Sequence, residues 1–237
     1  HMGTAGELCA SECGISRERQ DEFAVASYTK ALASQAAGKF VAEIVPVEVP
    51  QRRGDPIVVD SDEEPGKGRP DKIPSLRSVF MKDGTITAAN ASSINDGGAA
   101  LVVMARETAE TGGIAPLATI TAQAATGLAP LEVMWAPVPA VQQLWAQNGR
   151  AEADYDLYEH NEAFASASVA VMRGLGLQHA KLNPRGGAVA LGHPIGCPGA
   201  RIVITLMSAL RRTGGRRGFA TACLGGGMAT AIEVEVE

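Results

Sequence analysis

Hydrophobic and polar positions along the chain repeat with two periods, which predict helices and strands in alternation. Over the first 40 residues the apolar positions follow a helical period and predict two helices. The first has a capping box from Thr4 to Glu7 and should end at Gly14, because glycine adopts left-handed turns easily. Ser16 is expected to cap the second helix, and Gly38 is expected to end it.

Beyond residue 43 the pattern passes through an extended segment and a loop before strands and helices alternate. Residues 44–49 are predicted to be extended, and Pro46 places them at an edge or a bulge. Residues 50–78 are polar, charged and rich in Pro and Gly, so we expect a long surface loop. The alternation that follows is typical of a layered α/β fold. It predicts strands over residues 99–105, 117–121, 156–159, 219–223 and 229–236, and helices before Gly112 and over residues 137–147, 163–173 and 202–210.

The composition predicts a sizeable apolar core and excludes some classes of partner. Of the 237 residues, 46% are apolar and only 4% are aromatic, so small side chains should pack between close backbones. The net charge of -5 argues against a general nucleic-acid-binding protein. No apolar run is long enough to cross a bilayer, so no membrane partner is expected. Cations that could still hold a ligand phosphate are Arg52, Arg53, Lys67, Arg69 and Arg77.

The cysteines indicate a reducing compartment, either cytoplasmic or mitochondrial. The chain has four of them, without CxxC spacing and without a metal-ligand pattern shared with the four histidines. A disulfide scaffold is not expected at this chain length, and neither is a metal site. Helix packing is the expected role of Cys9 and Cys13.

Three short segments carry residues suited to catalysis, namely residues 160–165, 192–196 and 222–228. Each lies where a predicted strand ends or a predicted helix begins. In the second of them, His193 stands between Gly192 and Pro194, on a stiff backbone that would fix the direction of its imidazole. Taken alone, such a histidine is more often a turn residue than a general base. Cys223 precedes a run of three glycines, and taken alone it is more often a small buried apolar residue than a reactive thiol.

Together the three segments resemble the thiolase family. The resemblance rests on His160-Asn-Glu-Ala-Phe-Ala165, on the glycine-rich run from Gly186 to Arg201, and on Cys223-Leu-Gly-Gly-Gly227. Residues 90–97 and 16–24 also look like segments of the family, so the resemblance covers the whole chain. It implies an α/β fold with the layered αβαβα arrangement, whose N-terminal half is incomplete here. It divides the chain into a middle loop region (1–84), the last strand and helix of the N-terminal half (85–115) and a C-terminal domain (116–237).

The resemblance implies roles for four catalytic residues. His193 would activate a nucleophilic cysteine as a base and later donate a hydrogen bond to a thioester oxygen. Cys223 would be the second catalytic cysteine, which moves a proton at the α-carbon of the incoming acyl-CoA. Asn161 would hold a water that completes an oxyanion site with His193, and the Gly225 N–H would contribute to a second oxyanion site.

The resemblance also implies a substrate. Coenzyme A thioesters would react without a further cofactor, by Claisen condensation of two acetyl-CoA to acetoacetyl-CoA or by the reverse thiolysis. His1 and Met2 would lie near a short acyl group and the CoA arm, although the same two residues are also a common cloning remnant. The residues expected to line the pantetheine tunnel are Ser92, Phe80, Ala163 and Phe164.

The family's nucleophilic cysteine has no counterpart in this sequence, so the isolated chain is expected to be inactive. Three explanations stay open. The chain is a fragment of a longer product, one half of a split enzyme whose partner supplies the cysteine, or a CoA-binding or scaffolding subunit without catalysis. The complete enzyme would be a homo-oligomer. Pro198 and Arg185 depart from the family's usual residues and could alter the loop or the fit of CoA.

Overall fold

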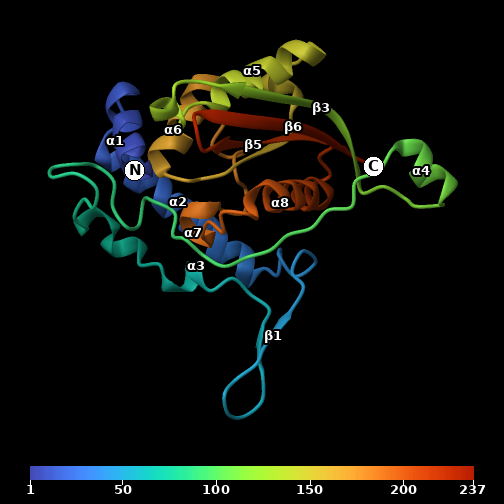
Figure 1. The fold of residues 1–237 in the computed structure, drawn as a ribbon, viewed down its shortest axis with the longest axis horizontal. Coiled ribbons are helices and arrows are strands. Elements are labelled where there is room, and N and C mark those ends of the chain that lie inside the picture. Colours follow the sequence, from blue (N-terminus) through green and yellow to red (C-terminus); the bar gives the residue numbers. More distant parts are fainter.

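A four-stranded mixed sheet forms the centre of the computed structural model, which describes residues 1–237 (Figure 1). The strand order is β3-β6-β5-β4, so the strand that comes last in the chain lies inside the sheet. β4 and β5 run parallel, whereas β6 pairs antiparallel with both of its neighbours. The strands are β3 (Ala118–Gly127), β4 (Leu157–His160), β5 (Arg217–Leu224) and β6 (Met228–Val236).

Helices cover both faces of this sheet because successive side chains of each strand point to opposite sides. On one face, Tyr158 and Phe219 join the larger apolar core with α5 (Pro137–Asn148) and α6 (Ala165–Leu175). On the other face, Leu157 and Ala220 pack against α8 (Pro198–Thr213). Each face thus has its own apolar cluster, as the alternation of strands and helices predicts.

Two N-terminal helices pack against the helices on the face of the sheet that carries the larger core. α1 (Met2–Glu12) contacts α6, and α2 (Arg17–Ala36) contacts both α6 and the short α7 (Ala188–Leu191). The predicted capping box at Thr4 is wrong, because the helix begins earlier and His1 Nδ1 accepts from the Gly3 N–H at 3.1 Å. The predicted cap of α2 is confirmed, since Ser16 Oγ accepts from the Arg19 N–H at 3.3 Å.

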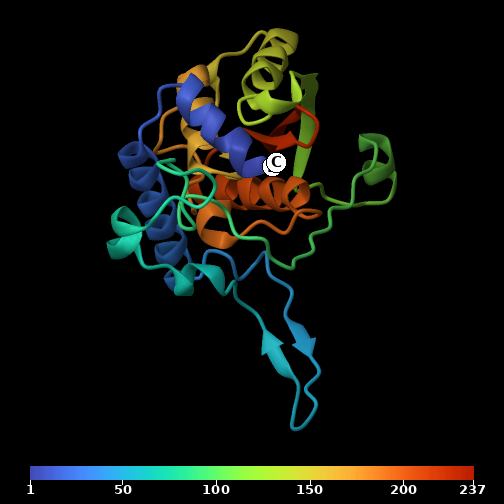
Figure 2. The same ribbon diagram turned by 60° about the vertical axis from the view of Figure 1, so that its left-hand side comes forward.

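Residues 44–84 begin with a segment that extends away from the body of the molecule and then return to it, where Ile73 is buried. β1 (Val47–Val49) and β2 (Ile57–Val59) form an exposed antiparallel hairpin that projects from the rest of the chain (Figure 2). The extended prediction for residues 44–49 is therefore confirmed in part. The expected surface loop is exposed, but it also contains β2, α3 (Glu64–Lys67) and a 3-10 helix over Pro70–Ser75.

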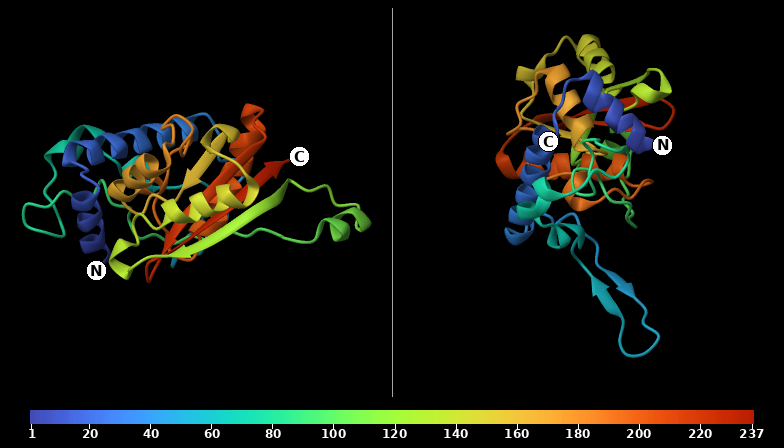
Figure 3. Two further views of the ribbon diagram at one scale, coloured as in Figure 1. Left: turned by 90° about the horizontal axis from the view of Figure 1, so that it is seen from above. Right: turned by 90° about the vertical axis from the view of Figure 1, so that its left-hand side faces the viewer.

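The predicted buried strand over residues 99–105 is wrong. The segment has no strand partner, and Val102 is 87% exposed and Val103 70% exposed. A strand needs a neighbour to satisfy its backbone amides, and residues 1–237 provide none for this segment. The short helix that follows, α4 (Arg106–Thr111), ends before Gly112 as predicted, at the far end of a long excursion of the chain (Figure 3).

The remaining predicted elements of the C-terminal part are confirmed, with longer or shifted ends. β3 continues to Gly127, α6 ends at Leu175 and is followed by Gly176 in a left-handed conformation, and α8 begins already at Pro198. Pro198 occupies the first turn of α8, where its missing N–H costs nothing. Single 3-10 turns occupy Pro130–Glu132 and Glu152–Asp154. None of the helices is both long and apolar enough to cross a membrane.

Candidate active site

Asn161 and Cys223 lie at the same edge of the sheet. β4 and β5 are parallel neighbours, and the last residue of β4, His160, pairs with Thr221 of β5. Asn161 follows directly and donates its N–H to the Thr221 carbonyl at 3.0 Å. Ligand sites of α/β sheets gather at this carboxyl edge, because the loops that follow parallel strands meet there.

The glycine-rich loop delivers His193 to a segment that is tied to this edge. Gly192 has a φ of +91°, and a Cβ at this position would overlap the side chain of Asn95. The His193 N–H donates to the Ser93 carbonyl at 2.9 Å and lies 3.2 Å from Asn95 Oδ1. The loop therefore needs glycine before the histidine, and residues 93–95 fix its backbone.

Hydrogen bonds connect the histidine loop to the loop that follows β4. Ser92 donates both its N–H and its hydroxyl to the Ala163 carbonyl, at 3.1 Å and 2.9 Å. Ala163 in turn donates its N–H to the Asn161 carbonyl at 2.9 Å. Residues 92–95 thus bridge from Asn161 to His193, two segments that lie more than 30 residues apart in the sequence.

Both polar side chains of the site keep an atom free for a ligand. Nδ1 of His193 and Oδ1 of Asn161 are buried and have no hydrogen-bond partner within the protein. Burial and the nearby Arg201 guanidinium lower the pKa of His193, so its imidazole is neutral at neutral pH. A neutral imidazole can accept a proton, and buried polar atoms without a protein partner commonly bind water or substrate.

The Cys223 thiol is in a different electrostatic state. The residue is half-buried and packs against the larger core, and burial raises the pKa of its thiol to about 11. The protonated thiol therefore dominates at neutral pH, which suits a group that donates a proton. Gly225 follows in the exposed turn between β5 and β6, where Gly226 and Gly227 have φ of +91° and +90°.

Three of the residues expected to contact substrate place their rings side by side, and we call them the aromatic row: His1, Phe80 and Phe164. The rings of His1 and Phe80 are 5.1 Å apart between centroids, and those of Phe80 and Phe164 are 6.1 Å apart. Gly3 of α1 lies against Phe80 so closely that a Cβ would overlap the ring. Phe164 directly follows Ala163, which accepts the two bonds from Ser92. Met2 begins α1 beside His1 and is 49% exposed.

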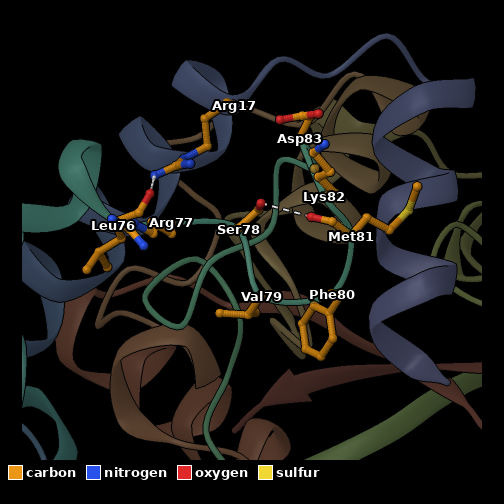
Figure 4. Close-up of a pocket in the computed structure, with 10 residues that line it drawn as sticks. Arg17, Leu76, Arg77, Ser78, Val79, Phe80, Met81, Lys82 and Asp83 are labelled. Atoms are coloured by element: carbon orange, nitrogen blue, oxygen red, sulfur yellow. Dashed lines mark hydrogen bonds between the residues drawn. The ribbon is translucent and has the colours of Figure 1, made fainter.

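A hollow of about 560 Å³ is lined by Arg17 and residues 76–84 (Figure 4). It includes Phe80 but none of Asn161, His193 and Cys223. The Arg17 guanidinium donates to the carbonyls of Ile73 and Leu76, at 3.1 Å and 2.8 Å, and so anchors one end of the segment. The hollow lies in the bend formed by residues 76–84, and the candidate catalytic groups are not part of it.

The five cations considered for a ligand phosphate do not meet. Arg52 and Arg53 lie in the turn of the projecting hairpin, between β1 and β2. Lys67 pairs with Glu64 of its own helix at 2.7 Å and with Glu63, the residue before that helix, at 3.2 Å. Arg77 lines the hollow, and Arg69 precedes the 3-10 helix. The structure therefore does not bring these cations together as a single phosphate site.

Several residues of the site were not predicted from the sequence. Asn183, at a φ of +44°, donates from Nδ2 to the His160 carbonyl at 2.9 Å and accepts the His160 N–H at 2.8 Å. Asn95 and Glu162 lie within segments that carry the family resemblance. The sequence therefore marked both residues, but it gave no role for either. Arg185 is buried and pairs with Glu43, and it therefore ties the loop to the body of the protein.

Comparison with known proteins agrees with this geometry. The family model for the thiolase N-terminal domain matches residues 1–107, and that for the thiolase C-terminal domain matches residues 114–236. The fold and the arrangement of strand ends, glycine-rich loop and cysteine define a thiolase, and the chain belongs to the thiolase family.

Its relatives carry the name acetyl-CoA acetyltransferase. The chain is 48% identical over 236 residues to that of Cupriavidus necator and 47% identical to that of Chromobacterium violaceum, covering 99% of this chain and 60% of each relative. The crystal structure of the Bacillus anthracis acetyl-CoA acetyltransferase superposes with a TM-score of 0.97 at 40% identity, over 100% of this chain and 60% of that one. Human mitochondrial 3-ketoacyl-CoA thiolase superposes with a TM-score of 0.91 at 35% identity, over 99% and 59%. The chain thus spans about 60% of the length of the curated relatives that it matches.

Proposed function

We propose that the chain is the C-terminal portion of an acetyl-CoA C-acetyltransferase. The complete enzyme would condense two acetyl-CoA to acetoacetyl-CoA and CoA, and would catalyse the reverse thiolysis. The observation that carries the proposal is the bridge of hydrogen bonds from Asn161 through residues 92–95 to His193, at the strand edge that also holds Cys223. The names of the relatives support the choice of substrate.

The chemistry follows from the state of each group. Neutral His193 takes the proton of a nucleophilic thiol, the thiolate attacks the acetyl-CoA carbonyl, and the departing CoA thiolate takes the proton of the Cys223 thiol. The Cys223 thiolate formed in this way removes a proton from the α-carbon of the second acetyl-CoA. The enolate attacks the acyl-enzyme carbonyl, and the nucleophilic cysteine leaves as a thiolate that recovers its proton from His193. His193 and a water held by Asn161 stabilise the enolate oxygen, and the Gly225 N–H donates to the oxygen of the acyl-enzyme. Each such donor contributes about 2.7–4 kcal/mol to lowering the barrier.

The aromatic row favours a short acyl chain. His1 caps α1 and contacts Phe80, whose ring also lies against Gly3 and Phe164. These contacts leave little space beside the Phe80 ring for an acyl chain. The rings would form an apolar wall for the pantetheine arm, next to the hydrogen bonds between Ser92 and Ala163. We therefore infer that acetyl-CoA and acetoacetyl-CoA are the substrates.

We infer that the nucleophilic cysteine comes from an N-terminal segment or a partner chain. None of the four cysteines serves this purpose. Cys9 is fully buried in α1 and bonds to the Ser166 carbonyl, Cys197 is buried, and burial raises the pKa of both thiols. Cys13 is the C-terminal cap of α1, where it is half-buried against the larger core. Cys223 holds the second role.

Complementation tests the proposal. The chain is mixed with the N-terminal remainder of the Cupriavidus necator relative, and thiolysis of acetoacetyl-CoA is followed. We expect activity from the mixture and none from either part alone. His193→Ala and Cys223→Ala should each abolish the activity, whereas Arg211→Ala, at an exposed position of α8, should leave it unchanged. Full activity of the Cys223→Ala mixture would refute the role of Cys223.

A second candidate function is CoA binding without catalysis, as a subunit or scaffold. It is favoured by one observation, namely that the aromatic row assembles from residues of this chain alone. Calorimetry with CoA distinguishes the two. Binding by the chain, combined with no turnover in any mixture that contains a nucleophilic half, would favour the second candidate.

A further inference from the structure

The Glu162 carboxylate is buried where four segments meet. The residue is 1% exposed. Its Oε2 accepts from the Ser27 hydroxyl of α2 at 2.6 Å and from the Val189 N–H of α7 at 3.2 Å, and its Oε1 accepts from Asn183 Nδ2 at 2.7 Å. Three donors converge on it, so both oxygens have hydrogen-bond partners although the residue is buried.

The backbone of the neighbouring loop is shaped to this carboxylate. A Cβ at Gly187 would overlap the Glu162 side chain, so only glycine allows the loop to approach. The Gly187 N–H donates to Ser27 Oγ at 3.1 Å, and the same hydroxyl donates to Glu162. The relay Gly187–Ser27–Glu162 therefore fixes the start of α7 as well as the carboxylate.

These contacts join the two parts of the candidate site. Glu162 follows Asn161 directly in the chain, and α7 ends at Leu191, two residues before His193. Asn183 also contributes to this connection. Its side-chain amide bonds to the Glu162 carboxylate and to the backbone of His160, the residue before Asn161. One carboxylate thus sets the place of the Asn161 segment relative to the loop that carries His193.

We propose that Glu162 is a positioning residue that holds Asn161 and His193 at the spacing an oxyanion site requires. It does not touch substrate, and it acts through His193 and through Asn161, which holds the water of the oxyanion site. The inference rests on the proposed function. The aromatic row has separate contacts, so a change at Glu162 should lower kcat and leave KM nearly unchanged, because a small misplacement of catalytic groups can cost about 10²-fold in rate.

Glu233 offers a matched control. It is fully buried in β6, and its carboxylate also accepts from three donors, Thr121 Oγ1 at 2.6 Å, Asn148 Nδ2 at 2.6 Å and the Tyr155 hydroxyl at 2.5 Å. Along β6 it lies four residues from Ala229, the partner of Cys223, or about 13 Å at the usual rise of a strand. Its loss should reduce stability to a similar degree without moving the site.

The first measurement uses the chain itself. NMR of the labelled imidazole of His193 is recorded for Glu162→Gln, Glu162→Asp, Glu233→Gln and the parent. We expect the His193 signals to shift or broaden in Glu162→Gln, to return towards the parent in Glu162→Asp, and to be unchanged in Glu233→Gln. Should Glu162→Gln fail to fold, Ser27→Ala removes one donor of the relay and should cause a smaller shift in the same signals.

The second measurement uses the complemented enzyme. Thiolysis by Glu162→Gln should lose about 10²-fold in kcat with KM within about threefold, while Glu233→Gln keeps its kcat within about twofold. Equal kcat in the two variants, or an unperturbed His193 signal in Glu162→Gln, overturns the inference. If the parent mixture has no activity, the proposed function fails, and the NMR result still decides whether Glu162 positions His193.

Discussion

Single buried groups determine how this protein responds to pH. Glu159 is fully buried on the face of β4 that packs against α8, and neither of its carboxylate oxygens has a hydrogen-bond partner within the protein. Burial raises the pKa of Glu159 to about 8, and the attraction of Arg201 only partly opposes the rise. The folded protein therefore holds a proton at neutral pH that the unfolded chain, with a glutamate pKa of about 4.3, has released.

This difference predicts a stability that falls as pH rises. Because the folded-state pKa of Glu159 is the higher one, folding becomes less favourable from about pH 4.5 up to about pH 8, by at most about 1.4 kcal/mol per pH unit. Glu159→Gln removes the titration. We expect the Tm of the variant relative to the parent to increase between pH 5 and pH 8.5, as measured by calorimetry. A difference that stays constant over this range would contradict the assignment.

The Cys223 thiol gives a second prediction for a single residue. With its pKa raised to about 11 by burial, the thiolate fraction grows about tenfold for each pH unit below that value. Alkylation of Cys223 by iodoacetamide in the isolated chain should therefore be slow at pH 7.5 and still accelerating at pH 9.5. Mass spectrometry of the peptides gives the rate for each cysteine, with Cys223→Ser identifying the site. A plateau reached by pH 8 would mean that a stabilising partner offsets burial.

At the level of single residues, the sequence indicated candidate residues for the site but not the contacts that connect them. Asn161 and Cys223 share one edge of the sheet because Asn161 follows β4 and Cys223 lies near the end of its parallel neighbour β5. The contacts of Glu162 with Ser27 and Asn183 join residues 135 and 21 positions apart. No local pattern encodes such pairs, because they arise from how whole elements pack.

Helix α1 and the segment that follows the hollow are held together by one carboxylate. Glu7 accepts from the N–H groups of Thr85 and Ile86 and from the Thr85 hydroxyl, over 2.8–3.0 Å. Glu7→Ala leaves the buried Ile86 N–H and the half-buried Thr85 donors without this partner, which should cost about 1–3 kcal/mol of unfolding free energy. Hydrogen exchange of residues 78–86 should become faster, and urea unfolding should report the loss. Glu12→Ala, at the exposed end of the same helix, should change neither.

Elements were predicted best where local chemistry decides their limits. Ser16 caps α2, and Gly112 ends α4, because a hydroxyl cap or a flexible backbone acts within a few residues. The cap of α1 was missed because a histidine replaces the usual hydroxyl or carboxamide. The hairpin of β1 and β2 escaped detection because its strands are three residues long and exposed.

On the scale of the molecule, the most conspicuous surface is the uncovered apolar segment over residues 99–105. Leu101, Val102, Val103 and Met104 are all exposed on a stretch without a strand partner (Figure 3). Such a stretch is prone to pair with another chain. The sequence predicted a buried strand here because its composition is that of a sheet interior, and the structure lacks the neighbours that would bury it.

This surface gives a prediction with a matched control. Val102→Lys should reduce light scattering and ANS binding by the isolated chain, with the Tm unchanged to within about 2 °C because the side chain is 87% exposed. The same change should prevent complementation by the N-terminal remainder. Val45→Lys, at a position that is 81% exposed near the hairpin, should leave complementation intact. Normal complementation by Val102→Lys would show that this segment does not bind the N-terminal remainder of the relative.

The strand order has a consequence for the timing of folding. β6 lies between β3 and β5 and is made after both, with about a hundred residues separating it from β3. Until β6 leaves the ribosome, β3 has no partner and the two apolar clusters remain open. The ribosome therefore releases almost the whole chain before the sheet can close, and during that interval the apolar faces of the strands already made are uncovered.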